Sequence, residues 1–295
     1  MMRTRLGWSG SVLALAAVLA LGLAGCGGAK QPSGTGVSGA SAGAGAGGGS
    51  GGGNALRAVA WKLADVLPGN TDAVFLFFND DGNLNLQTLD LLVNGQSVGQ
   101  GGQFQVGGMQ LSKGVLLQIQ PSPPAGATIE VTAQNNSGAT LRSNTITVQA
   151  GPFAQGNTPA GGFRTLQPQY GATGQGTSPR LSFAHSSGQA ASYQVVCFQI
   201  DPQQGAIQDI PVAVEVPAGT FSVIPGQGTP GIVFANDPLP LPGDFVWHAV
   251  VLDSSGWGVG TTIDVAGWNQ LPPNLPNPTQ AQLQVINTWP YFTSN

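Results

Sequence analysis

The chain has 295 residues, of which 46 are Gly, 22 are Pro and only 7% are charged. An average soluble protein carries roughly 25% charged residues, so this composition argues against an ordinary cytosolic enzyme. Nine Lys and Arg against 13 Asp and Glu leave a net charge of −4. Because no basic patch is present to neutralise phosphates, no nucleic-acid partner is expected. The length is enough for about two domains.

Residues 1–25 have the pattern of an export signal. Arg3 and Arg5 precede Ser11–Leu23, an apolar run that is too short to span a membrane comfortably. The run ends in Leu23-Ala24-Gly25-Cys26, which resembles the lipobox of bacterial lipoproteins. In that family the signal is cut just before the Cys, and the Cys thiol is acylated. The alternative interpretation is a plain signal peptide followed by an unrelated Cys.

The resemblance implies that Cys26 is lipidated and that this lipid holds the protein at a membrane of the bacterial cell envelope. Diacylglycerol plus an N-acyl chain exceeds the two signals that stable attachment requires. Gly27 follows the Cys, and in Gram-negative lipoproteins a residue other than Asp at this place implies the outer membrane. Residues 26–53 are nearly all Gly, Ala and Ser. They predict a flexible tether that spans roughly 30 Å.

Between residues 54 and 150, short apolar segments alternate with Gly, Pro and Asn, which predicts β-strands. Asn94-Gly95 between two apolar stretches is a hairpin signal. Residues 55–67 also fit a helical spacing of apolar side chains, but we favour a strand because Val59 and Trp61 alternate and everything downstream is β. The expected strands are Arg57–Asp65, Ala73–Asn79, Leu89–Val93, Gln103–Val106, Val115–Gln120, Thr128–Gln134 and Asn144–Gln149.

A Gly- and Pro-rich linker at 151–164 separates a second strand-rich half at 165–267. The expected strands of this half are Arg180–Ala184, Ser192–Ile200, Ile210–Val216, Thr220–Ile224, Gly231–Phe234, Asp244–Asp253 and Thr261–Val265. Residues 268–295 contain several prolines, whose missing N–H donors exclude a central strand. They predict an extended tail along the second half, with Trp289, Tyr291 and Phe292 as docking points.

Three stretches of the second half resemble bacterial fibronectin type III-like domains, namely Ser178–Phe183, Ala191–Val195 and Leu241–Gly256. Phe245 stands where such domains usually place a corner Tyr, which leaves an immunoglobulin-like relative open. In the first half, the stretches Leu92–Gly95, Asn136–Gly138 and Asn144–Val148 are similar to bacterial immunoglobulin-like domains.

The expected fold class is therefore all-β. Two tandem immunoglobulin-like or fibronectin type III-like β-sandwiches, 54–150 and 165–267, follow the signal peptide and the tether. Each half is long enough to hold a core between two sheets of its own.

The residues that most often carry catalysis are few. If Cys26 is lipidated, Cys197 is the only other Cys, so no intrachain disulfide can form. Cys197 shares a strand face with Tyr193 and Val195 by period 2, and in the resembling family this face is the core. We therefore expect a buried, unreactive thiol.

Two histidines are present, His185 and His248, and neither lies in a recognisable catalytic or zinc motif. His248 should point away from the face that carries Phe245 and Trp247, and hence toward solvent.

Asp80, Asp81 and Asn83 form the one segment with several hard oxygen ligands, the kind that Ca²⁺ prefers. Their spacing does not match an EF-hand loop, and a turn in which Asp and Asn bond their own backbone is the alternative. No other cofactor is expected.

Trp257 lies in Asp253–Gly258, at the tip of an expected hairpin. A Trp exposed on a loop could stack on sugars or on a protein partner. The alternative is that its ring folds back over the end of the sandwich.

These features favour a non-enzymatic, membrane-anchored envelope lipoprotein that acts as a binding, adhesion or spacer module. Its partner would be an envelope protein or a glycan. The alternative function is a carbohydrate-binding accessory protein, or a component of a carbohydrate-active enzyme, that uses exposed aromatic side chains.

Overall fold

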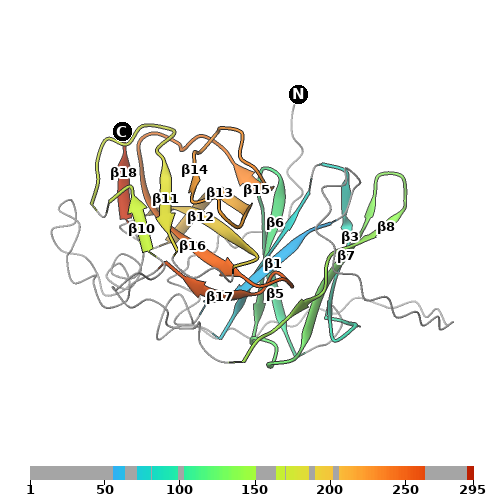
Figure 1. The fold of residues 1–295 in the computed structure, drawn as a ribbon. Helices are drawn as coiled ribbons and strands as arrows, with labels where there is room; N and C mark the ends of the chain where they lie inside the picture. The colour runs from blue at the N-terminus through green and yellow to red at the C-terminus, as the bar shows by residue number, and fades with distance from the viewer. Residues whose placement is uncertain are drawn as a thin grey trace.

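The computed structural model describes residues 56–63, 72–80, 82–98, 103–150, 164–169, 171–185, 190–201, 206–262 and 291–295. Their named strands pair antiparallel in several sheets, and no α-helix occurs among them (Figure 1). The expected all-β fold class is therefore confirmed for the described part of the chain. The lipobox and the tether lie outside it.

The strands of the first half form two sheets. They are β1 Ala58–Lys62, β2 Val74–Asn79, β3 Leu84–Val93, β4 Gln96–Ser97, β5 Gln105–Gln110, β6 Gly114–Gln120, β7 Thr128–Asn135, β8 Thr140–Arg142 and β9 Ile146–Thr147. Sheet 1 has the order β4-β3-β7-β8, with β9 beside β7. Sheet 2 has the order β1-β2-β6-β5.

The second half, with the end of the chain, also forms two sheets. Its strands are β10 Arg164–Gln167, β11 Leu181–Ala184, β12 Ser192–Asp201, β13 Ala206–Pro217, β14 Ser222–Val223, β15 Ile232–Asn236, β16 Gly243–Leu252, β17 Gly258–Thr261 and β18 Tyr291–Ser294. Sheet 3 has the order β15-β13-β12-β16-β17, with β18 beside β16, and sheet 4 has the order β10-β11-β14.

The ambiguous segment at 55–67 contains a strand. β1 pairs antiparallel with β2 in an unbroken register from Ala58 opposite Phe78 to Lys62 opposite Val74. The strand interpretation is thus confirmed and the helical one is wrong. The hairpin signal is confirmed as well, because Asn94 and Gly95 adopt φ of 53° and 74° between β3 and β4, as a two-residue turn of this kind requires.

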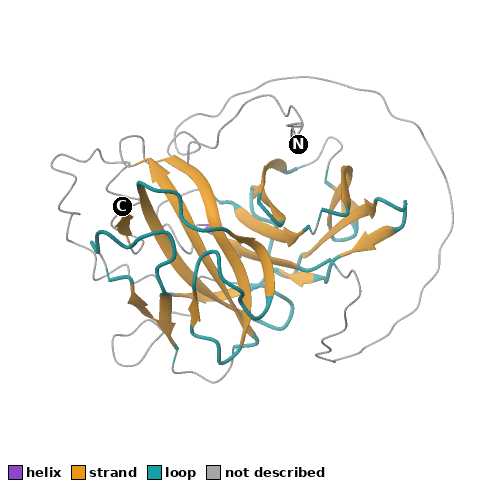
Figure 2. Ribbon diagram, turned by 90° about the horizontal axis from the view of Figure 1, so that it is seen from above, coloured by secondary structure: helices purple, strands orange, loops and turns teal. Residues whose placement is uncertain are grey.

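The four sheets are stacked in the order 1, 2, 3, 4, with a hydrophobic core in each of the three gaps. Figure 2 shows the sheets of the two halves against one another. Most strands of sheets 2 and 3 are buried on both faces because their alternate residues enter different cores. In β2, for example, Leu76 and Phe78 enter the core shared with sheet 1, whereas Phe75 and Phe77 enter the core shared with sheet 3.

The core between sheets 2 and 3, here called the middle core, joins the two halves of the chain. It holds large, fully buried aromatic side chains, among them Trp61 and Phe77 from the first half and Phe198 and Phe234 from the second. The sandwiches are therefore fused face to face. Each was expected to have its own core, and a third core lies between them.

The Pro-rich tail ends in a strand. Residues 291–294 form β18, which pairs with residues 243–246 of β16. Tyr291 enters the middle core, and Phe292 enters the core between sheets 3 and 4. Both side chains are docked, as expected. The segment that carries them is a strand at a sheet edge, however, and not an extended tail. Residues 291–294 contain no proline, so their N–H groups are available for strand pairing. Trp289 lies outside the described residues.

A hydrogen bond between two buried side chains crosses the middle core. Trp61 Nε1–H donates to Gln194 Oε1 of β12 at 2.7 Å, and both residues are fully buried. A buried pair of this kind is costly to break from one side only, because the remaining polar atom loses its partner.

We predict that Trp61→Phe lowers the free energy of unfolding by about 2–4 kcal/mol, since it leaves Gln194 Oε1 unpaired and removes buried volume. The double variant with Gln194→Leu should recover part of this loss, because no polar atom is then left unpaired. Urea denaturation of both single variants and the double variant measures the coupling energy. Strictly additive losses would contradict the prediction.

Candidate functional site

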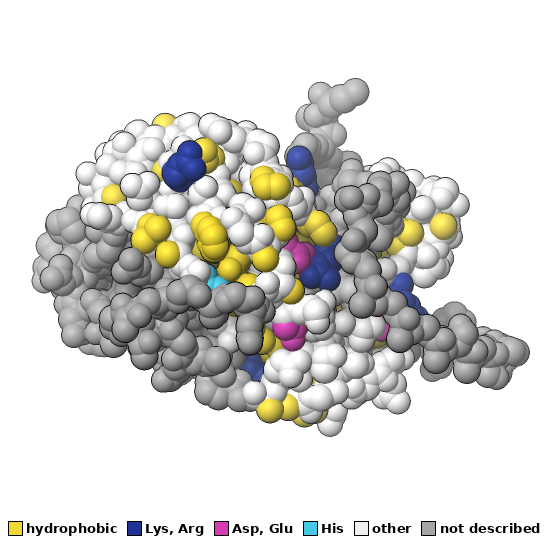
Figure 3. All heavy atoms as spheres, in the orientation of Figure 1, with side chains coloured by type: hydrophobic (Ala, Val, Ile, Leu, Met, Phe, Trp, Pro, Cys, Tyr) yellow, Lys and Arg dark blue, Asp and Glu magenta, His cyan; other side chains and the backbone are white. Residues whose placement is uncertain are grey.

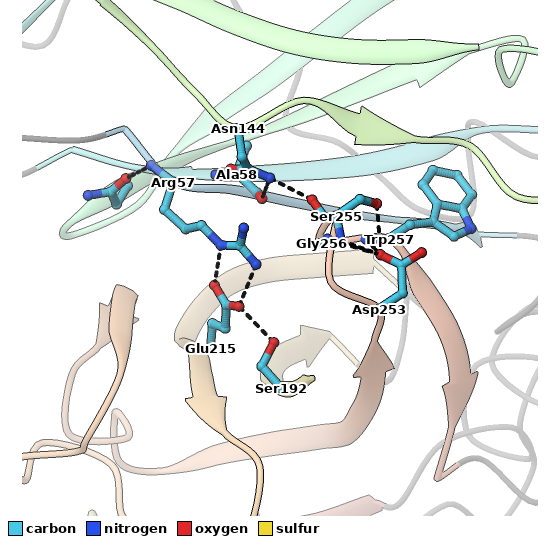
Figure 4. A network of polar contacts seen from close by, with 10 residues as sticks. Arg57, Ala58, Asn144, Ser192, Glu215, Asp253, Ser255, Gly256 and Trp257 are labelled. Atoms are coloured by element: carbon cyan, nitrogen blue, oxygen red, sulfur yellow. Dashed lines mark hydrogen bonds and ion pairs between the residues drawn. The ribbon is translucent and has the colours of Figure 1, made fainter. Parts of the chain in front are cut away.

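The best-formed polar network lies where the two halves meet (Figure 4). Arg57, just before β1, donates from Nε and Nη2 to Glu215 Oε2 and Oε1 on β13, at 2.8 and 2.7 Å. Ser192 Oγ also donates to Glu215 Oε1, at 2.7 Å. The side chain of Glu215 is only 9% exposed, so this bidentate pair is shielded from the solvent that weakens surface ion pairs. It fixes sheet 2 against sheet 3.

A second set of contacts fixes the turn between β16 and β17 against β1 (Figure 4). Asp253 Oδ1 accepts the backbone N–H groups of Ser255, Gly256 and Trp257 at 2.8, 3.1 and 3.0 Å. The Gly256 carbonyl accepts the N–H of Ala60 at 2.9 Å. Gly256 has φ of 96°, and a Cβ there would lie 2.8 Å from the Ala58 carbonyl oxygen, so this close approach requires glycine.

Asn144 links this turn to the first half. Its Oδ1 accepts the N–H of Ala58 at 2.8 Å, and its Nδ2 donates to the carbonyls of Ala58 and Ser255 at 3.0 and 2.6 Å. One side chain thus holds β1 and the β16–β17 turn together.

Trp257 is not an exposed binding platform. Its side chain is 2% exposed and packs in the core between sheets 1 and 2. The hypothesis of a stacking surface at Trp257 is therefore wrong, because it requires an exposed ring. The expected hairpin tip exists, but it faces β1 and not solvent, so the alternative of a ring folded back onto protein is the one observed.

His248 does not point to solvent either. It is fully buried in the interface of sheets 2 and 3, beside the rings of Trp61 and Phe198, with Nδ1 3.3 Å from Thr261 Oγ1. The sequence predicts that the face of β16 opposite Phe245 and Trp247 is exposed to solvent, but that face lines the middle core. Burial among apolar groups lowers the pKa of His248 from 6.5 to about 3.

This shift predicts acid sensitivity. Because the folded-state pKa lies below the unfolded value, the stabilisation is complete above pH 6.5 and is lost as the pH falls toward 3. Relative to His248→Leu, the wild-type free energy of unfolding should fall by up to roughly 1.4 kcal/mol per pH unit in this window. Urea titrations of both proteins between pH 7 and pH 4 test this, and parallel curves would refute it.

Cys197 is buried in the core between sheets 3 and 4, on the same face as Tyr193 and Val195. This position is the expected one. Burial raises the pKa of the thiol well above its ordinary value, which suppresses the reactive thiolate.

Of the calcium candidates, Asp80 closes a turn. Its Oδ1 accepts the N–H groups of Gly82 at 2.8 Å and Leu84 at 3.3 Å, and the Asn83 carbonyl accepts the N–H of Asn136 at 2.8 Å. These are the contacts of the alternative, turn-forming interpretation. Asp81 and Cys26 lie outside the described residues. Within the described ranges, no group of three or more His, Cys, Asp or Glu gathers as a metal site would require.

An exposed aromatic ring does occur in the second half, at a position that sequence reasoning missed. Phe221, before β14, is 40% exposed. Its ring centroid lies 5.7 Å from that of Phe183 and 5.8 Å from that of Tyr193. The Tyr193 hydroxyl lies 2.9 Å from His185 Nδ1, and burial lowers the pKa of His185. The only signal in the sequence is an aromatic residue directly after the turn at Gly219.

No protein-family model matches this sequence, and no curated protein matches it. Within the described ranges, no helix has the length and hydropathy to cross a membrane. A solved structure with some similarity is the SGBP-B protein of the Bacteroides ovatus mixed-linkage glucan utilization locus, in complex with a mixed-linkage heptasaccharide. Identity is 12% and the TM-score is 0.18, over 70% of this chain and 42% of that one. This chain thus spans less than half of that protein, and a TM-score so low supports no functional argument.

Proposed function

We propose that this protein is a non-enzymatic, lipid-anchored component of the bacterial cell envelope that presents a rigid β-sheet body for binding at the end of a flexible tether. One observation carries the proposal. A lipobox-like Leu23-Ala24-Gly25-Cys26 and a Gly-rich segment at 26–53 precede a body whose two halves share a continuous core.

The placement of the reactive side chains supports binding over catalysis. Cys197 and His248 are enclosed in hydrophobic cores. Burial raises the pKa of the Cys197 thiol and lowers the pKa of the His248 imidazole, so both side chains are held in their uncharged forms. Glu215 is engaged by Arg57 and Ser192. Each of these groups already serves the packing of the body.

The character of the surface supports an uncharged partner. Figure 3 shows few charged side chains on the face it displays, among mostly uncharged polar and backbone atoms. With only 7% charged residues in the chain, electrostatic steering contributes little. Hydrogen bonding and apolar contact are left as the means of recognition, which suits a glycan or a neutral protein surface.

The anchor is tested by Cys26→Ser in the full-length chain. We expect the variant to leave the membrane fraction and its N-terminal peptide to lose the mass of the lipid, since attachment needs the acylated thiol. Cys197→Ala is the matched control and should remain in the membrane fraction. A Cys26→Ser protein that resists a high-salt wash of the membranes would refute the anchor.

Glycan binding is a second candidate function, and the exposed Phe221 ring favours it. Phe183 and Tyr193 hold this ring from behind. A fixed apolar ring at the surface can stack on a sugar face without losing much conformational freedom.

Phe221→Ala should therefore weaken retention on insoluble cellulose, chitin or peptidoglycan at least about tenfold, which corresponds to a loss of about 1.4 kcal/mol. Phe221→Trp should keep it. Leu241→Ala, at another exposed apolar side chain, is the matched control and should bind normally. Sedimentation with each polysaccharide measures the bound fraction, and equal binding by all four proteins would exclude Phe221 as the site.

A further inference from the structure

A cleft of about 200 Å³ opens into the first half between sheets 1 and 2. Its walls are Leu86, Gln87 and Leu89 of β3 and residues 108–110 of β5, and β6 contributes Val115 and Leu117. The lining is apolar apart from two glutamines, and it contains no charged side chain.

Two local features open this cleft. The pairing of β3 with β7 shifts between Asn85 and Asp90, so the segment between them departs from the regular ladder. On the other wall, Gly108 has no side chain to fill the space, and a Cβ there would come within 3.0 Å of Leu117 Cδ2.

β5 borders the cleft and is an outer strand of sheet 2, where it pairs with β6. The N–H of Leu111 donates to the carbonyl of Gly114 at 2.8 Å. Hydrogen-bonded pairs alternate along an antiparallel ladder, so Met109 and Gly107 also direct their backbone groups at β6. The N–H and C=O groups of Val106, Gly108 and Gln110 therefore point outward, where no described strand pairs with them.

Among the residues that the structure describes, none gives this edge the features that normally protect an outer strand. Gln105–Gln110 has no charged residue and no Pro, its register with β6 is unbroken, and Val106 is 40% exposed. The edge strands of sheets in natural proteins usually carry lysines, prolines or bulges, or are covered by loops, and these features prevent pairing with another chain. A flat, uncharged and exposed edge is suited to pairing with another strand.

We propose that two copies of this protein pair through β5, antiparallel, about a two-fold axis at Gly108. In this register Gly108 faces Gly108 of the second copy, and Val106 faces Gln110. The outward-pointing groups of three residues on each strand then satisfy one another. The interface is isologous, which means that the same surface is used on both copies.

The absence of charge on β5 favours a second copy as the occupant. A two-fold axis brings the same strand against itself, so any charged residue near the axis would face a like charge at short range. Pairing also extends sheet 2 across the axis and brings the two apolar clefts next to each other. This would cover the exposed Val106 and the apolar wall formed by Leu86 and Leu89.

Gly108→Cys tests the pairing in the full-length protein. Residues directly opposite in a hydrogen-bonded pair have Cα atoms about 5.5 Å apart, within disulfide range. We expect mild oxidation to give a covalent dimer that a reductant dissolves. Gly107→Cys is the matched control, because its Cβ has open space and its symmetry mate is about 7–8 Å away. Oxidation should give no covalent dimer of this control, and none of the parent chain.

A second variant tests the same register without a thiol. Val106→Pro with Gln110→Pro removes outward N–H donors and leaves the N–H groups that bond to β6 in place. Light scattering in mild detergent should give the mass of two chains for the parent and for Gly107→Ala, and of one chain for the double-proline variant.

Three outcomes would overturn the proposal. They are a parent protein with the mass of a single chain, equal crosslinking at positions 107 and 108, and a crosslinked product that contains a different protein in place of a second copy. The pairing through β5 does not depend on the lipid anchor. A negative result in either experiment therefore leaves the other proposal unaffected.

Discussion

The middle core is the constraint on which the rest of the structure depends. Sheets 2 and 3 give apolar side chains to both of their faces, so neither could remain in water on one side without exposing rings such as Trp61, Phe77 and Phe198. Burying a side chain of this size is worth roughly 1.5–3 kcal/mol. The two halves are therefore one structural unit, although the strands of each belong to a separate stretch of sequence.

The polar contacts within this core and at its margin determine how the halves are aligned. Apolar packing is not directional, whereas the Arg57–Glu215 pair, the Asn144 bridge and the Trp61–Gln194 bond each accept little displacement. The Gly256 turn adds a backbone contact at the same seam. A surface formed by both halves would thus keep its shape.

The sequence allowed most of the strands to be located, because turn residues separate apolar runs throughout the body. It did not reveal that the two sandwiches pack face to face. For this reason His248 and Trp257 were expected at the surface, whereas both are buried. A signal was nonetheless present. Val74–Phe78 and residues 195–198 are continuous apolar runs and do not alternate, which is typical of strands buried on both faces.

Other features could not be predicted from the sequence for a physical reason. The exposure of Phe221 and the open edge of β5 depend on which strands lie beside them, and strand order is set by contacts between residues far apart in the chain. The local sequence pattern predicts which side chains lie on each face of a strand, but it does not predict which strands pair with it.

The position of β18 has a consequence for how the protein assembles. This strand covers residues 243–246 of β16 and places Tyr291 in the middle core, yet it follows all the other named strands of the described residues. Until it arrives, the edge of β16 is only partly paired, by β17, and the core shared by both halves lacks one of its large rings. The shared core therefore reaches its final packing only when this last named strand has docked, so the body closes from the end of the described chain and not from its beginning.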